Sequence, residues 1–423
     1  MQMKKIAVSL FAAGIMASPL AYATNGYFAH GYGIKAKGMA GVGYALPQDT
    51  LAAANNPAGM VMVGDRMDLG LDLFRPQRGS TVAGNNCGLG CSLDGTYNGD
   101  DTSVFPIPEF GYNKMLNPNM ALGVSVYGNG GMNTDYQNSP FSAFGVTGRT
   151  GVNLAQLFVA PTFSMKVNES NSVGVSLNLA YQIFEAKGLQ PFQGLSSDPS
   201  KVTNNGVDGS AGYGVHIGWI GQVTSMITLG ASYQSKTQMQ KFHKYAGLFA
   251  QQGAFDIPAS YGAGIAVTPL PDTTIAFDVQ QIQYGDVKSI ANTNAQGGPL
   301  GADNGPGFGW QNMTAYKVGV SHVYSPNLTL RAGYSTNNQQ IPGSQTFFNI
   351  LAPGVVKTHL TLGTTWTLQN KSELTFGYMH AFKKTIQGSG SIAPGFPPAG
   401  FGGGEADIKM YQDSIGVAYS WKL

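Results

Sequence analysis

The chain has 423 residues, and its 24 basic and 22 acidic side chains give a formal net charge of +2 at pH 7. This near-neutral balance gives no support to nucleic-acid binding, which requires a basic face. Only 11% of the residues are charged, against about 25% in typical soluble domains, and glycine has about twice its usual share. The chain therefore lacks the charge that solvates a soluble surface.

Residues 1–23 have the three-part pattern of a secretory signal peptide. Two lysines precede an apolar run over residues 6–17, and Ala21-Tyr22-Ala23 supplies small residues for a cleavage site. The run is too short to cross a bilayer as a helix. A buried N-terminal helix is the alternative, and we predict cleavage after Ala23. No later stretch of 18 apolar residues is present, so a closed barrel is the remaining way to span a membrane.

Residues 24–64, here called the N-terminal segment, are rich in glycine and show no regular alternation of polarity. They include Asn55-Asn56-Pro57-Ala58-Gly59 and precede the first alternating stretch. The segment either hangs outside a barrel or folds into its lumen. A barrel of fourteen strands encloses more space than its own side chains fill, so we predict a plug, or hatch, in the lumen.

Two cysteines occur in Cys87-Gly-Leu-Gly-Cys91. The secretory route is oxidising, so a small disulfide that closes a loop is the favoured interpretation. A metal site is the alternative, but two thiols with no nearby histidine are half of a ligand set.

Residues 65–423 contain about fourteen stretches in which apolar residues alternate with polar or small ones. Successive side chains of a strand point to opposite faces, so each stretch predicts a ribbon with one apolar face. The final strand is typical: its apolar face carries Ile415, Val417, Tyr419, Trp421 and Leu423. The fourteen stretches begin near residues 65, 104, 119, 152, 171, 211, 226, 257, 272, 311, 327, 355, 372 and 409. We predict an all-β membrane protein, a 14-stranded antiparallel transmembrane β-barrel over 65–423 with lipid outside.

Short and long connections alternate between these stretches. The short ones are turns of Asn, Pro, Ser and Asp, near residues 117–118, 168–171, 224–225, 269–272, 325–326 and 370–371. The long ones lie near 78–103, 132–151, 187–210, 239–256, 288–310, 337–354 and 386–408. Outer-membrane barrels have short periplasmic turns and long extracellular loops. The pattern therefore predicts location in the outer membrane of a Gram-negative bacterium.

Three N-terminal stretches, residues 24–33, 37–45 and 50–60, make the chain resemble the outer-membrane long-chain fatty acid transporter family (FadL/TodX-like). This family includes aromatic-hydrocarbon uptake barrels. The family's Asn-Pro-Ala hatch signature is matched by Asn56, Pro57 and Ala58, and residues 330–342 resemble a late family strand and its loop. The resemblance covers the whole mature chain. It implies a barrel plugged by its N-terminus, through which hydrophobic ligands pass and leave sideways through the wall.

Candidate site residues follow from this resemblance. The family's inward kink corresponds to Gly128, Asn129, Gly130 and Gly131, where three glycines in four residues favour a bulge and a lateral opening. A plain glycine-rich loop start is the alternative. The family's mature N-terminus lines its ligand pocket. The corresponding residues here are Thr24, Asn25, Gly26, Tyr27 and Phe28.

Two long connectors carry apolar residues that a solvated loop does not need. Phe242, Tyr245 and Phe249 fall on one face of a predicted short helix. The other candidate contacts in these connectors are Leu248, Leu189 and Phe192. Packing of the loops on the barrel rim is the alternative role. Lys317 and Arg331 are candidate partners for a carboxylate head group, or else are paired with acidic residues of the lumen.

We therefore predict passive uptake of long-chain fatty acids or hydrocarbons by a monomer that contacts outer-membrane lipid and lipopolysaccharide. The alternatives are a general porin for polar solutes and a structural or adhesive surface barrel. The six histidines show no HExxH spacing, and no Gly-x-Ser-x-Gly elbow or phosphate-binding loop is present in a fitting context. We expect no enzyme activity, no cofactor, no bound metal and no nucleic-acid partner.

Overall fold

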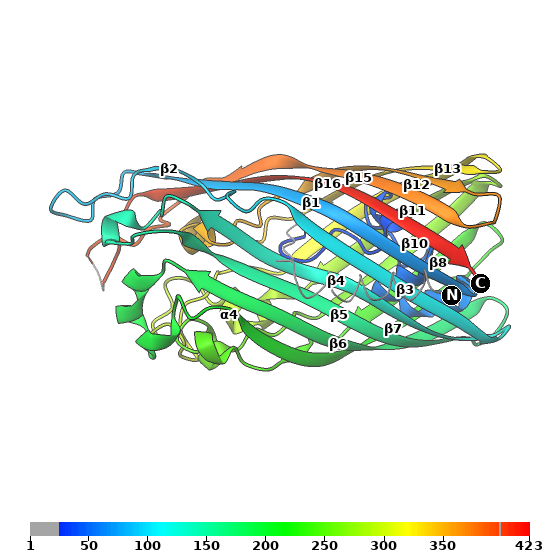
Figure 1. The fold of residues 1–423 in the computed structure, drawn as a ribbon, viewed down its shortest axis with the longest axis horizontal. Helices are drawn as coiled ribbons and strands as arrows, with labels where there is room; N and C mark the ends of the chain where they lie inside the picture. The colour runs from blue at the N-terminus through cyan, green and yellow to red at the C-terminus, as the bar shows by residue number, and fades with distance from the viewer. Residues whose placement is uncertain (1–24, 397–398) are drawn as a thin grey trace.

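The computed structural model describes residues 25–396 and 399–423, so the predicted signal peptide and Thr24 lie outside the described residues. Within these ranges one antiparallel sheet closes on itself, because the last strand, β16, pairs with the first, β1 (Figure 1). Two short strands, β2 (Gly95–Asn98) and β9 (Gln238–Met239), extend the sheet at one end. The other fourteen strands form the wall, which confirms the predicted barrel.

The wall strands follow one another around the barrel in sequence order. Each begins within four residues of the predicted start. Their bounds are β1 Arg66–Ala83, β3 Phe105–Asn117, β4 Met120–Tyr136, β5 Thr150–Lys166, β6 Asn171–Lys187, β7 Asp208–Gln222, β8 Ile227–Gln234, β10 Ser260–Leu270, β11 Thr273–Ile282, β12 Met313–Ser325, β13 Leu328–Asn337, β14 Thr358–Thr367, β15 Glu373–Ile386 and β16 Glu405–Lys422.

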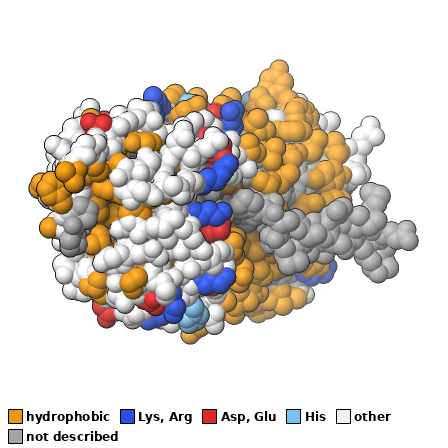
Figure 2. Space-filling view, turned by 60° about the vertical axis from the view of Figure 1, so that its left-hand side comes forward, with side chains coloured by type: hydrophobic (Ala, Val, Ile, Leu, Met, Phe, Trp, Pro, Cys, Tyr) orange, Lys and Arg blue, Asp and Glu red, His pale blue; other side chains and the backbone are white. Residues whose placement is uncertain are grey.

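The outward faces of the strands are apolar, and the inward faces are small or polar. On β6, Val175, Leu177 and Leu179 are exposed, whereas Ser176 and Asn178 are fully buried in the interior. Figure 2 shows hydrophobic side chains over the barrel wall, beside a band of charged side chains. No helix among the described residues is long and apolar enough to cross a bilayer. Such a wall buries its polar backbone in its own ladders and offers hydrocarbon to its surroundings.

Tight turns gather at one end of the barrel, where β16 ends, and long connectors gather at the other end with β2 (Figure 1). Short helices occur in the N-terminal segment and in the long connectors. They are α2 Ile34–Lys37, η1 Thr50–Ala54, η2 Pro57–Met62, η3 Ser142–Phe144, η4 Gln190–Leu195, η5 Pro199–Lys201, η6 His243–Tyr245, α3 Ala250–Gly253, η7 Tyr284–Asp286, α4 Lys288–Ala291, η8 Gly343–Gln345 and η9 Phe348–Ile350. The long connectors therefore supply enough residues at this end of the barrel to form a binding site.

Candidate functional site

The described part of the N-terminal segment lies inside the barrel and touches the wall from several directions. A Cβ atom added to Gly111 of β3 would lie 2.0 Å from Thr50 Oγ1. One added to Gly230 of β8 would lie 1.9 Å from the Tyr44 carbonyl oxygen. Glycine is required at such positions because the backbones approach more closely than any side chain permits. The inward glycines of the strands therefore make room for the segment.

Buried ion pairs attach α2 to the wall. Lys35 Nζ lies 2.5 Å from Glu373 of β15, and Lys37 Nζ lies 2.8 Å from Asp72 of β1 and 3.6 Å from Glu109 of β3. Burial lowers the pKa of Lys37, but the two carboxylates outweigh it and the net pKa is raised, so the ammonium stays charged. Lumen acids thus serve as counter-charges for the N-terminal segment.

The Asn-Pro-Ala tripeptide joins the segment to the opposite part of the wall. The Asn56 amide donates to the carbonyls of Tyr44 at 2.7 Å and Trp219 at 2.9 Å, and its Oδ1 accepts from the Ala58 N–H. This last bond caps η2, whose first residue is Pro57. Ser164 of β5 donates to the Ala58 carbonyl at 3.1 Å. Asn56 is therefore both a helix cap and a link between the segment and β7.

An apolar cavity of ≈ 60 Å³ lies at the loop-bearing end of the barrel. All of its lining side chains except Ser289 and Gly307 are hydrocarbon. The lining residues are Phe141, Val152, Phe184, Leu189, Phe192, Leu248, Phe249, Ser289, Leu300, Pro306, Gly307, Phe308, Phe348 and Leu351. They come from β5, β6 and five different long connectors. The walls of this cavity offer burial to an apolar molecule and almost nothing that would hold a polar one.

Four of the predicted contacts line this cavity, namely Leu189, Phe192, Leu248 and Phe249. Phe242 and Tyr245 do not line it, because they are packed behind Phe184 with ring centroids 5.6 and 4.8 Å from it. The predicted continuous helix over residues 242–249 is wrong. The connector instead forms the separate turns η6 and α3, and left-handed backbone at Gln251 and Gln252 breaks the second turn.

A row of aromatic rings leads from the cavity to the N-terminal residues. Phe249 lies 4.8 Å from Phe255, and Phe255 lies 6.1 Å from Tyr27, measured between ring centroids. Tyr27 in turn packs on Tyr284 at 5.3 Å and on Trp310 at 5.9 Å. The Tyr284 hydroxyl donates to the Asn25 carbonyl and accepts from the Tyr27 and Phe28 N–H groups. Residues 25–28 are thus held at the inner end of an apolar path.

The path ends beside a break in the wall between β3 and β4. Within the described residues these strands pair only from Phe110 opposite Val126 to Asn117 opposite Met120. By contrast, β4 pairs with β5 along its whole length, with a register shift between Gly128 and Gly130. Residues 127–133 of β4 therefore have no partner on β3.

The free edge of β4 pairs with the N-terminal segment instead. Ala29 N–H donates to the Asn129 carbonyl at 2.9 Å, and Gly131 N–H donates to the Tyr27 carbonyl at 2.9 Å. A Cβ atom on Gly130 would lie 2.0 Å from that same Tyr27 oxygen, so this position requires glycine. Nearer the loop-bearing end, the buried Arg78 of β1 donates to the Asn133 carbonyl at 2.8 Å. This bond links β1 directly to β4 beyond the break.

Lys317 and Arg331 both point into the lumen, but neither lines the apolar cavity. Lys317 Nζ donates to the His30 carbonyl at 3.1 Å, and Arg331 Nε donates to Gln48 Oε1 at 3.0 Å. They are not directly opposite in the β12–β13 ladder, where Lys317 faces Ser335. Both cations hold the N-terminal segment.

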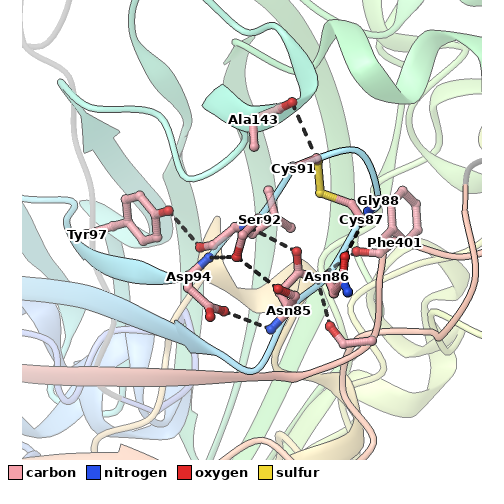
Figure 3. Close-up of a disulfide and its surroundings, with 12 residues drawn as sticks. Asn85, Asn86, Cys87, Gly88, Cys91, Ser92, Asp94, Tyr97, Ala143 and Phe401 are labelled. Atoms are coloured by element: carbon pink, nitrogen blue, oxygen red, sulfur yellow. Dashed lines mark hydrogen bonds between the residues drawn. A yellow bond between two sulfur atoms is a disulfide. The ribbon is translucent and has the colours of Figure 1, made fainter.

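Cys87 and Cys91 are joined by a disulfide in the outermost connector (Figure 3). The loop around them is organised by Asn85, whose side chain donates to the carbonyls of Phe401 and Gly403 and accepts from Leu93 N–H. No group of three or more metal-ligating side chains is assembled among the residues that the structure describes.

Comparison with known proteins identifies the family of the chain. The sequence profile of the outer membrane protein transport protein family (OMPP1/FadL/TodX) matches residues 14–391. The chain belongs to the FadL/TodX family. It is therefore an outer-membrane transport protein, as predicted. No curated protein matches the chain in sequence.

Solved structures of FadL/TodX-like proteins share the fold of this family member. The Pseudomonas putida toluene transporter TodX aligns at a TM-score of 0.69 and 17% identity, over 93% of this chain and 99% of that one. A Pseudomonas aeruginosa FadL homologue aligns at 0.70 and 16% identity, over 94% and 99%. The Ralstonia pickettii toluene transporter TbuX aligns at 0.65 and 16% identity, over 93% and 99%.

Several residues of the site were not predicted from the sequence of this family member. Phe184 lies on the inward face of a regular strand and carries no local signal of a ligand contact. Phe141, Phe308, Phe348 and Leu351 come from connectors whose meeting in space no pattern reveals. Arg78 follows Arg75 and Gln77 in a polar stretch, so its position beside the break could not be recognised from the sequence.

Proposed function

We propose that the protein takes up hydrophobic compounds, long-chain fatty acids or hydrocarbons, by passive transfer from the cavity to the wall break and out into the membrane. The observation that carries this proposal is the row of packed aromatic rings that joins the cavity to an interrupted strand pairing. Burial of each methylene contributes about 0.8 kcal/mol, so such a path attracts apolar ligands out of water. Exit into lipid returns no methylene to water.

Entry requires movement of the connectors. The cavity of ≈ 60 Å³ is smaller than the apolar cavities of about 150 Å³ that bind benzene. Leu248, Phe249 and Phe192 come from two separate connectors, whose outward displacement enlarges the cavity. We propose that these side chains form the entry site, with Asn25, Gly26, Tyr27 and Phe28 at its inner end. Thr24, which lies outside the described residues, is included in the proposed site because it directly precedes Asn25 in the sequence.

We also propose the division into a signal peptide (1–23), a hatch (24–64) and a barrel (65–423). The support is that the hatch fills the lumen and uses inward-facing cations and anions of the wall as partners. This filling argues against the alternative of a general porin, which needs an open lumen lined by charge. We propose that Lys317 and Arg331 hold the hatch rather than a ligand head group. An adhesive barrel has no need of an internal apolar path.

The decisive test is uptake in a host that lacks its own fatty acid transporter, with radiolabelled oleate, toluene and glucose as the panel. Uptake of an apolar compound, but not of glucose, supports the proposal. Gly130→Val is expected to slow this uptake, because its side chain collides with the Tyr27 carbonyl at the break. Deleting residues 25–60 is expected to admit glucose. An intact barrel that transports glucose and no apolar compound refutes the proposal.

A further inference from the structure

Two prolines lie on the part of β3 that pairs with β1 but not with β4. Pro106 and Pro108 are the second and fourth residues of the strand, and their rings are on its outward, half-buried face. The β3–β4 ladder ends at Phe110 opposite Val126, and β4 has a register shift between Gly128 and Gly130 just beyond it, so the two prolines lie at the level of residues 128–131. The prolines of one edge therefore lie at the level of the glycine bulge of the other edge.

The β1–β3 ladder determines where the two ring nitrogens point. In an antiparallel ladder, alternate residues direct their N–H and C=O groups to opposite neighbours. The pairing of β3 with β1 continues through residues 105–113 without a register shift, and proline has no N–H to contribute to it. The odd-numbered residues must therefore bond to β1. Consistently, Met115 N–H donates to Asp65, the residue just before β1. Pro106 and Pro108 thus direct their nitrogens toward β4.

Both positions at which β3 would donate to β4 within the break therefore lack a donor. An unpaired N–H at a lipid-facing edge is strongly unfavourable, and it is also a ready partner for any strand that approaches. On the opposite side, the free groups of Asn129 and Gly131 are taken by Ala29 and Tyr27. The two edges of the break thus fail to pair for different reasons. The β3 edge lacks N–H donors, and the backbone groups of the β4 edge are already bonded to the N-terminal segment.

We infer that Pro106 and Pro108 are the positioning residues that keep the lateral exit open. This inference rests on the proposed function, because it takes the break as the exit. Restoring both donors removes the obstacle on the β3 edge, so that β3 can compete with Ala29 and Tyr27 for the edge of β4 and close the route without altering the cavity. Valine is a suitable replacement because it is a better strand former than proline and retains an apolar side chain toward lipid.

The test compares Pro106→Val/Pro108→Val with Pro161→Val, a proline replacement in β5 away from the β3–β4 break. Pro161 stands opposite Val124 of β4, and the ladder to β6 skips residues 160 and 161. Uptake by the double variant is expected to fall about ten-fold or more, since two added hydrogen bonds favour the closed pairing. Equilibrium binding of the same ligand to the purified barrel is expected to stay within about two-fold of wild type, as is uptake by the control. Wild-type uptake by a fully assembled double variant overturns the inference.

A cross-link separates this inference from the proposed function. Ile107→Cys and Asn129→Cys place one thiol on each edge of the break, beyond the last β3–β4 pair, and we expect the two to meet only when the pairing is continuous. Oxidation is expected to join them readily when both prolines are valine and poorly when they are present; equal yields overturn the inference. If the joined barrel still transports at the wild-type rate, the wall exit and this inference both fail. If joining blocks uptake but the valine variant transports normally, only the role of the prolines fails.

Discussion

Replacing Lys37 with methionine is expected to loosen the hatch. The ammonium lies 2.8 Å from Asp72 and 3.6 Å from Glu109, and all three side chains are at most 12% exposed. The substitution leaves two buried carboxylates without a counter-charge. Breaking a buried pair in this way costs about 3–5 kcal/mol, and protonation of one carboxyl reduces that cost. A loss of this size is enough to populate barrels whose hatch has left the wall.

The assay is conductance of the purified barrel in planar bilayers, with thermal unfolding measured in parallel. Lys37→Met is expected to raise conductance and lower the unfolding temperature. The matched control is Lys114→Met, because the Lys114–Asp65 pair has a similar length, 2.7 Å, but its side chains are 54% and 28% exposed. Surface pairs contribute about 0–1 kcal/mol, so the control should change neither quantity.

A rescue tests the electrostatic explanation itself. Adding Asp72→Asn and Glu109→Gln to Lys37→Met removes the uncompensated charge and should recover part of the stability. If Lys37→Met conducts and unfolds like the Lys114→Met control, α2 is not held by these pairs and the reasoning is wrong.

Three further outcomes are expected. Phe249→Ala should weaken ligand binding about ten-fold, since it removes part of the apolar wall against which a ligand is buried at about 25 cal/mol per Å²; an unchanged titration would exclude the cavity as the entry site. Burial and the charge of Asp68 raise the pKa of Asp49 to about 6, so its contribution to stability is full below pH 4 and is lost as pH rises through 6. Asp49→Asn should therefore raise the unfolding temperature at pH 7.5 but not at pH 4. Replacing Cys87 and Cys91 with serine should speed proteolysis of that loop and leave uptake unchanged; a loss of uptake would contradict its peripheral role.

The strands and turns of the wall could be predicted because their causes are local. Alternation such as that of Val175, Leu177 and Leu179 reflects the pleat itself, and turn residues such as Asn117-Pro118 favour the tight connection between β3 and β4. The glycine run at 128–131 likewise indicated a bulge, because residues without side chains permit one.

The partners of the site residues could not be predicted, because they depend on contacts between distant parts of the chain. Lys317 and Arg331 suggested a head-group site because the sequence does not show that both donate to the N-terminal segment. The helical spacing of Phe242 and Phe249 did not reveal that η6 ends at Tyr245 and that Phe249 has extended backbone. The prolines of β3 acquire meaning only from the register of a neighbouring strand.

The seam between β1 and β16 has a consequence for biogenesis. Its ladder joins Arg66–Ala83 to Glu405–Lys422, so the cylinder cannot close before the last strand has been synthesised. Contacts so remote in sequence form slowly. The N-terminal segment is joined directly to β1. Its buried charges are therefore expected to meet their partners on the wall as β1 and β16 pair. Because the N-terminal segment directly precedes β1, we expect it to be enclosed as β1 and β16 pair rather than inserted afterwards.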